Sequence, residues 1–246
     1  MKASNIIEKM NQWVPKDYID SWDNTGFQIG DPERQVDKIL IALDLDRDVL
    51  NKAIDGNFQM IITHHPIIFK PLTTITTMDY NTNIILDTIK HNIVVYNAHS
   101  NLDIADGGVN DCLANALGLR DAIPLSLVNR ETLSQSLGYG RVGYVDKIGF
   151  DDYLEIIKTN LSAKYLVIYG DRRKYIEKVA VYGQEQLTFS ATDRDSDGFA
   201  YFEALEDGTN YDAGKWETKI FGMPLTTDGA TPTSNTSGTT GTSTQN

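Results

Sequence analysis

The stretch KILIALDLDRDVLNKAIDGNFQMIITHH, residues 38–65, indicates the fold class of this chain. It begins with an apolar run of strand length, continues with a segment of helical spacing that stops at Gly56, and ends with a second apolar run. The same order repeats downstream, with a helix expected at 81–92 and a third strand at 93–99. Because a helix that joins two strands returns the chain over a sheet face, the strands it joins are parallel. The sequence predicts an α/β fold with a mostly parallel, doubly wound sheet and flanking helices.

Three regions follow one another along the chain. We expect an α/β domain over residues 1–125 and a smaller α+β or β-rich region over 126–225. Residues 226–246 are mostly Thr, Ser, Gly and Asn and offer too little apolar surface to offset the entropy of ordering them, so we expect a disordered tail. Further expected elements are a helix at 3–13, an irregular loop at 20–31, a helix at 150–163, and strands at 163–170 and 177–183.

Composition and charge exclude several classes of function. With 41% hydrophobic and 23% charged residues, the 246-residue chain has the balance of a soluble globular protein. Its formal net charge of −12 argues against a nucleic-acid partner, since such proteins draw much of their affinity from clustered Lys and Arg. No apolar run approaches the ~18 residues of a membrane helix, and the N-terminal segment lacks the apolar core of a signal peptide. We therefore expect a cytoplasmic protein that binds neither nucleic acid nor membrane.

Metal-capable side chains follow each of the three expected strands. Asp44 ends the first strand, His64 and His65 end the second, and His99 and Asp103 follow the third. Because ligands of open α/β sheets bind at the carboxyl ends of the strands, we expect these side chains to converge. Imidazole nitrogens and carboxylate oxygens together suit zinc, iron, manganese or nickel. The sequence predicts a divalent transition-metal site with His64, His65 and Asp103 as ligands.

The adjacent histidines pose a geometric problem, because neighbouring side chains of a strand point to opposite faces of the sheet. Pro66 ends regular pairing and favours an extended or turn conformation at His65, which allows both rings to face one cavity. The other solution is two metals, each bound by one histidine.

Four other residues have competing interpretations. His99 is a direct ligand, a residue that orients Asp103, or a strand-end residue bonded to backbone, and the last two roles are favoured over the first. Asp44 either belongs to the site or caps the helix that follows it. We expect His91 to be exposed near a helix end without a function, and Cys112, the single cysteine, to be buried on a helix.

Four segments resemble the dinuclear-metal proteins called Ngg-interacting-factor-three-like, also known as GTP cyclohydrolase I type 2 homologues. These segments are WDNTGFQIG (22–30), KILIALDL (38–45), IITHHPIIFKPL (61–72) and VVYNAHSNLDIADGGVNDCLANALGL (94–119), with a weaker likeness up to VAVYG (179–183). The resemblance implies two transition-metal ions, held from this half by His64, His65 and Asp103, in a toroidal hexamer. It also implies hydrolytic opening of the GTP purine ring with release of formate. The expected substrate is thus a nucleotide-like small molecule, and the expected assembly a homo-oligomer.

The chain departs from this family towards its C-terminal end. The family completes its site with a His-x-x-x-Glu segment whose glutamate bridges the metals, whereas no histidine follows His99 here. We therefore expect one weakly held metal, or a site completed by other groups, with reduced or absent chemistry. In place of that motif, Asp193, Asp195 and Asp197 resemble the start of a calcium loop, but position 204, where the closing glutamate should fall, is Ala, so a complete calcium loop is disfavoured. FAYFEAL (199–205) alternates like a strand from the β-sandwich repeats of surface and phage proteins.

Two functions follow from these residues. The intact strand-end residues favour a metal-dependent hydrolase acting on a nucleotide-like substrate. The missing C-terminal motif favours a non-catalytic metal-binding scaffold or partner-binding protein with a degraded dinuclear site. A third interpretation, a part of a surface or virion assembly, requires a repeat array or a signal peptide, and the sequence shows neither.

Overall fold

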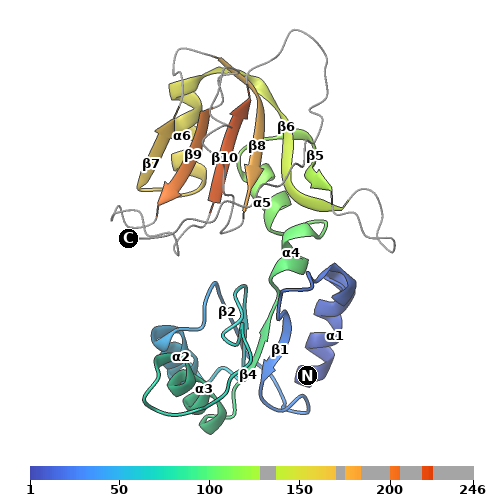
Figure 1. Ribbon diagram of the computed structural model, residues 1–246, viewed down its shortest axis with the longest axis vertical. Helices are drawn as coiled ribbons and strands as arrows, with labels where there is room; N and C mark the ends of the chain where they lie inside the picture. The colour runs from blue at the N-terminus through green and yellow to red at the C-terminus, as the bar shows by residue number, and fades with distance from the viewer. Residues whose placement is uncertain (128–136, 170–174, 184–199, 206–217, 224–246) are drawn as a thin grey trace, which may run out of the picture.

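A four-stranded sheet forms the lower half of the protein in Figure 1 and carries the N-terminal part of the chain. The computed structural model describes residues 1–127, 137–169, 175–183, 200–205 and 218–223. The strand order is β1-β4-β3-β2, in which β2, β3 and β4 are parallel and β1 runs antiparallel to β4. The strands are β1 (Gly26–Ile29), β2 (Ile39–Ala42), β3 (Met60–Thr63) and β4 (Val94–Asn97). The expected mostly parallel sheet is therefore confirmed.

Helices flank both faces of this sheet. They are α1 (Ala3–Trp13), a 3-10 turn η1 (Lys16–Tyr18), α2 (Arg47–Asp55) and α3 (Tyr80–Lys90). Side chains alternate along β3, so that Met60 packs in the core with α1 and Ile61 packs in the core with α2 and α3. The doubly wound arrangement is met only in part, because both crossover helices, α2 and α3, cover the same face, whereas the other face packs against α1, with η1 and the short helix that follows β4 beside it (Figure 1).

The expectation of an irregular loop at 20–31 is wrong in part, because this segment contains β1. β1 has only four residues and begins at Gly26, which adopts a φ of +127°. Beyond its end, Gly30 has a φ of +109°, and an added Cβ there would lie 2.9 Å from the Cα of Val94. The turn-rich composition that suggested a loop thus includes Gly26, whose positive φ favours glycine, and Gly30, which allows close approach to β4.

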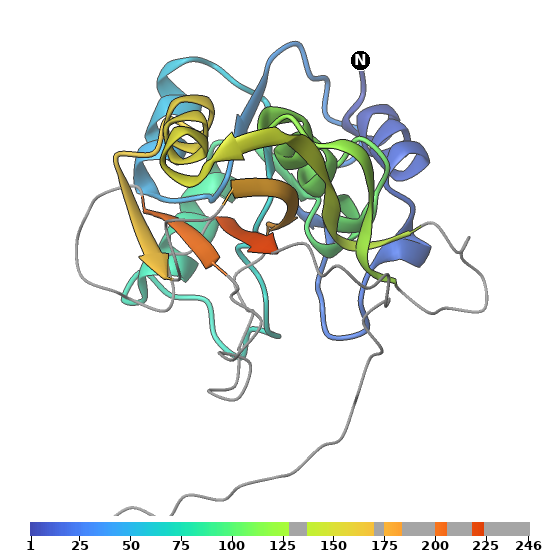
Figure 2. The same ribbon diagram turned by 90° about the horizontal axis from the view of Figure 1, so that it is seen from above.

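A second sheet of six antiparallel strands lies above the first, in the order β5-β6-β8-β10-β9-β7 (Figures 1 and 2). Its strands are β5 (Arg120–Leu127), β6 (Gly138–Gly149), β7 (Tyr165–Tyr169), β8 (Tyr175–Tyr182), β9 (Ala200–Leu205) and β10 (Thr218–Met223), and its helix is α6 (Phe150–Asn160). The predicted helix and the strands that match β7, β8 and β9 are confirmed. The sequence did not indicate β5, β6 or β10; for the first two, Pro124 and the glycines of β6 disfavour regular strands. Pro124 is accommodated because β5 is an edge strand.

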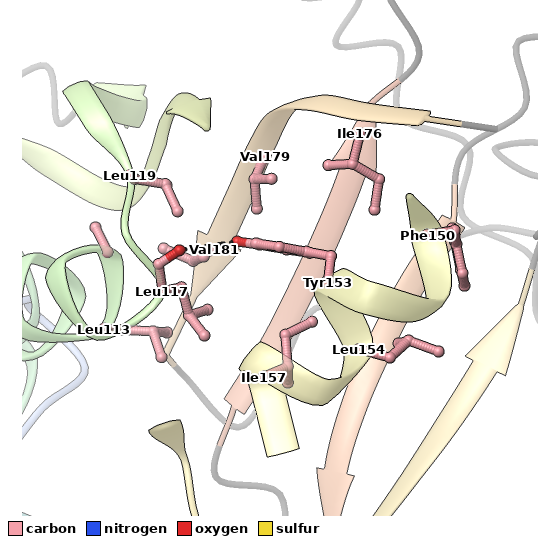
Figure 3. Packing of buried hydrophobic residues seen from close by; sticks show 11 residues of the cluster. Leu113, Leu117, Leu119, Phe150, Tyr153, Leu154, Ile157, Ile176, Val179 and Val181 are labelled. Carbon is pink, nitrogen blue, oxygen red and sulfur yellow. Dashed lines mark hydrogen bonds between the residues drawn. The ribbon is translucent and has the colours of Figure 1, made fainter. Parts of the chain in front are cut away.

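Two short helices connect the sheets, α4 (Ser100–Ile104) and α5 (Val109–Ala116) (Figure 1). Figure 3 shows the core that α5 and α6 form on one face of the second sheet. Within it, the Tyr153 hydroxyl donates to the Leu117 carbonyl over 3.1 Å, and Ile157 is fully buried. Burial of an aliphatic side chain of this size contributes about 1.5–3 kcal/mol, so this core anchors the connecting helices to the second sheet.

Cys112 is exposed, and the expectation that it is buried is wrong. The buried face of α5 contains Asn110, Leu113 and Ala114, and position 112 lies outside it. The aspartates of the calcium-like segment and residues 226–246 lie outside the described part of the chain, and the domain boundary near residue 125 stays a prediction. In the described ranges, no helix combines the length and apolar character needed to cross a membrane.

Candidate metal centre

Three histidine rings meet at the carboxyl ends of β3 and β4. His64 and His65 directly follow β3, and His99 follows β4 and precedes α4. The centroid of the His64 ring lies 4.9 Å from that of His65 and 5.1 Å from that of His99, and the His65 and His99 centroids are 5.5 Å apart. Each ring offers one nitrogen such that the three atoms lie within 4.8 Å of one another. The parallel pairing of β3 and β4 thus brings distant residues to one edge, as the sequence predicted.

The adjacent histidines face one site because the strand ends before them. β3 stops at Thr63, and the backbone N–H groups of His64 and His65 both donate to the Leu43 carbonyl, over 3.1 and 3.0 Å. A regular strand would not direct two successive N–H groups to one acceptor. The Thr63 hydroxyl also donates to the His65 carbonyl over 2.8 Å. This turn removes the strict alternation of side chains, as the interpretation based on Pro66 expected.

Each of the three imidazoles donates from Nδ1 to an oxygen. The acceptors are the Ala98 carbonyl for His64 at 2.8 Å, Asp44 Oδ1 for His65 at 2.8 Å, and Asp23 Oδ1 for His99 at 2.9 Å. A carbonyl or an ionised carboxylate can only accept a hydrogen bond, so in the neutral form of each ring Nδ1 carries the proton. The lone pair is then on Nε2 in each ring. This pattern of an oxygen acceptor behind each imidazole is typical of histidines that bind a metal.

Asp44 belongs to this site and does not cap a helix. The N-cap of α2 is Asp46, whose carboxylate accepts a hydrogen bond from the Val49 N–H over 2.7 Å. Asp44 instead accepts from His65, and this hydrogen bond lowers the pKa of Asp44 below its ordinary value. His91 lies at the C-terminal end of α3 and is exposed, as expected.

Asp103 is fully buried on α4 and approaches the cluster from the side of His64. Its Oδ1 lies 3.6 Å from His64 Nε2. Asn110 holds this segment against the second sheet, because its side chain donates to the Asp103 carbonyl over 2.9 Å and accepts from the Gly183 N–H over 2.8 Å. Asp103 is not part of the compact group of three ligand atoms, in which His99 takes the third place. The sequence favoured an orienting or structural role for His99, and the structure brings its ring to the site itself.

Asp23 is a site residue that the sequence did not indicate. Its carboxylate accepts hydrogen bonds from His99 Nδ1, from the Ser100 hydroxyl at 2.6 Å and N–H at 3.2 Å, and from the Thr25 hydroxyl at 2.5 Å. Burial alone would raise the pKa of Asp23, but these hydrogen bonds outweigh it and hold the pKa well below its usual range. Asp23 lies in the turn-rich segment before β1, and the only clue to its role is its place in WDNTGFQIG.

The electrostatics of the cluster keep His64 neutral. Burial is the main cause that lowers its pKa to about 4, and the neighbouring rings of His65 and His99 lower it further. An imidazole that is neutral near pH 7 can offer its lone pair to a cation without first losing a proton. The residues present therefore fit a divalent transition metal with nitrogen ligands.

The chain resembles a defined family in sequence and in fold. The model of the Duf34/NIF3 (NGG1p interacting factor 3) family matches residues 1–186. A Clostridium perfringens protein named GTP cyclohydrolase 1 type 2 homolog is 34% identical over 182 residues, which cover 74% of this chain and 68% of that protein. The protein of the same name from Halalkalibacterium halodurans is 40% identical over 136 residues, which cover 54% of this chain and 37% of that protein. The matched part therefore spans between about a third and two thirds of these relatives.

Solved structures show the same relationship. A hypothetical protein of Staphylococcus aureus superposes with a TM-score of 0.69 at 27% identity, covering 74% of this chain and 72% of that one. Reduced HcgD from Methanocaldococcus jannaschii superposes with a TM-score of 0.58 at 33% identity, covering 68% of this chain and 63% of that one.

Proposed function

Because this chain belongs to the Duf34/NIF3 family, we propose that it binds a divalent transition metal and acts as a metal-dependent hydrolase on a nucleotide-like small molecule. The observation that carries this proposal is the set of three imidazoles whose Nδ1 atoms all donate to oxygens, while their ligand atoms lie within 4.8 Å of one another. A chance group of partly buried histidines has no reason to combine an oxygen acceptor behind each Nδ1 with ring nitrogens that lie so close together.

The ligands we propose are His64, His65 and Asp103, as the family resemblance implies, together with His99. A divalent ion held by these residues would supply a Lewis acid that polarises a carbon–nitrogen or carbon–oxygen bond of the substrate ring, makes the ring carbon more electrophilic and stabilises the charge that develops. The other residues act through the ligands. Asp23 and Asp44 hold their imidazoles in the tautomer with Nδ1 protonated, and both carboxylates balance the charge of the cation.

We propose one ion and not two. Two cations at close range need a bridging carboxylate to offset their repulsion, and the motif that supplies it in the family requires a histidine that this chain does not have after His99. His99 then provides the third imidazole for a single zinc, iron, manganese or nickel ion. A homo-oligomeric, cytoplasmic protein is the assembly and location that the family resemblance supports.

The alternative is a metal-binding scaffold without catalysis. The absence of the bridging glutamate motif supports it, because the same carboxylate would also assist proton transfer. The scaffold would keep the metal and the fold but turn over no substrate.

Metal analysis of the purified protein tests the proposal. We expect one transition-metal ion per chain in the wild type and in His91→Ala, which removes an exposed histidine outside the cluster, and loss of the ion in His64→Ala. Wild-type protein that binds no transition metal when zinc, iron or manganese is added would refute it. Release of formate from GTP by the metal-loaded protein then separates the hydrolase from the scaffold.

A further inference from the structure

Two exposed aromatic side chains lie beside the histidine cluster. Trp22 is 56% exposed and Phe69 is 44% exposed, and their ring centroids are 6.2 Å apart. Both rings also lie close to His99, with centroids 5.9 and 6.4 Å from its ring and planes nearly perpendicular to it. The aromatic pair therefore adjoins the proposed metal centre and leaves parts of two apolar rings exposed to water side by side.

Hydrogen bonds hold the two loops that carry the pair. The Asn24 side chain donates to the Ile68 carbonyl over 2.5 Å, the Ile68 N–H donates to Gln28 Oε1 over 3.2 Å, and Gln28 Nε2 donates to the Asn24 carbonyl over 2.8 Å. Residues 24 and 28 belong to the segment of Trp22, and Ile68 directly precedes Phe69. Ile68 also packs against the core under α2 and α3. The pair is thus positioned before any ligand arrives, which reduces the entropy lost on binding.

From this geometry we propose that Trp22 and Phe69 bind a planar heteroaromatic ring, of the nucleobase class, and place it against the metal centre. Proteins commonly hold such rings by stacking them on aromatic side chains, an interaction that does not depend on which hydrogen-bonding groups the ring carries. The inference rests on the proposed function, because it assigns the residues that hold the ring of that substrate.

The charge around the pair indicates which part of a nucleotide lies there. Asp23 and Asp44 flank the cluster as carboxylates that accept hydrogen bonds from His99 and His65, so they would repel a phosphate placed next to them. The neutral ring is the part of the molecule that fits beside the histidines. A nucleoside without phosphate is therefore the appropriate probe.

Saturation-transfer NMR measures the binding of guanosine and tests the proposal, with ribose as the reference compound. The measurement is made on zinc-loaded and on metal-free protein. We expect guanosine to bind and ribose not to bind. Trp22→Leu and Phe69→Leu should each weaken guanosine binding about tenfold, whereas Trp22→Phe should retain it within about threefold. Trp13→Leu is the matched control, since Trp13 is a similarly exposed tryptophan at the end of α1 that donates to the Asp106 carbonyl.

Zinc titration and light scattering on the same variants separate this proposal from the metal site. Zinc affinity should be unchanged in Trp22→Leu and Phe69→Leu, because neither residue is a proposed ligand. Wild-type protein that binds zinc but not guanosine, or a Trp22→Leu variant that binds guanosine as the wild type does, would overturn the aromatic proposal alone. A change of oligomeric mass in both leucine variants would also overturn it, since the pair would then belong to a subunit contact. Failure of the wild type to bind zinc contradicts the metal proposal, and guanosine binding by the metal-free protein still decides the role of the pair.

Discussion

Replacement of Asp23 by Asn should disable His99 as a ligand while leaving the fold in place. One oxygen of Asp23 accepts from His99, and the other accepts from the Ser100 hydroxyl and N–H and from the Thr25 hydroxyl. An asparagine has a single side-chain oxygen, and this oxygen would face the three donors from Ser100 and Thr25. The NH₂ group would then face His99 Nδ1. Two donors cannot face each other, and the imidazole would move its proton to Nε2. The nitrogen that faces the cluster could then no longer bind a metal.

The expected loss follows from the role of such an orienting partner. Removal of a residue that orients a metal ligand costs roughly 10–100-fold in affinity, or about 1.4–2.7 kcal/mol. Competition with a chromophoric zinc chelator at pH 7.5 measures this affinity. Asp46→Asn is the matched control, because it makes the same change at the N-cap of α2, where Asn and Asp serve about equally well. A folded Asp23→Asn variant that binds zinc within about threefold of the wild type would refute the reasoning.

Three further predictions concern stability and access. The pKa of His64 is lowered from 6.5 to about 4, so between these pH values the unfolded chain binds a proton at this residue and the folded chain does not. The free energy of unfolding of the metal-free protein should therefore fall by up to about 3 kcal/mol as the pH falls from 6.5 to 4. His64→Gln should make the free energy of unfolding depend less on pH, as measured by urea titrations. An equal pH dependence of the free energy of unfolding in the wild type and in His64→Gln would contradict the lowered pKa of His64. Leu50→Ala should lower the free energy of unfolding by about 2–5 kcal/mol in urea titrations, since Leu50 is a fully buried residue of α2, and a loss below about 1 kcal/mol would disprove its place in the core. Cys112 should react with a thiol reagent in the native protein as fast as after unfolding, and protection in the folded state would show that it is covered.

The parallel part of the fold was predictable because its signals are local. β3 and β4 are short apolar runs, each preceded by an amphipathic helix, and the helix crossovers determine their direction. β1 and β6 were missed for a physical reason. Their glycines lower strand propensity, and β1 also pairs with a strand far away in sequence, as in the pairing of Gly26 with Asn97.

The site was predictable as far as residue type and strand order determine it. His64 and His65 face one site because β3 ends directly before them. Asp44 reaches the same edge of the sheet because it lies just beyond the end of β2. The role of His99 depends on the direction of its ring, which is set by Asp23, 76 residues away in the chain. No local pattern encodes that contact, because Asp23 lies in a polar turn where aspartate is common for other reasons.

Charge balance is the reason why we propose one cation at this site and not two. Three neutral imidazoles contribute no charge, so compensation has to come from carboxylates. The carboxylates are Asp103, as a proposed ligand, and Asp23 and Asp44, which accept hydrogen bonds from the imidazoles. Their combined negative charge offsets the charge of one divalent ion but not that of two. A second ion would add repulsion at short range in a partly buried site, where screening by water is weak. The same carboxylates disfavour a phosphate at this place, so the neutral ring of a substrate, held by Trp22 and Phe69, is the group that can approach the metal.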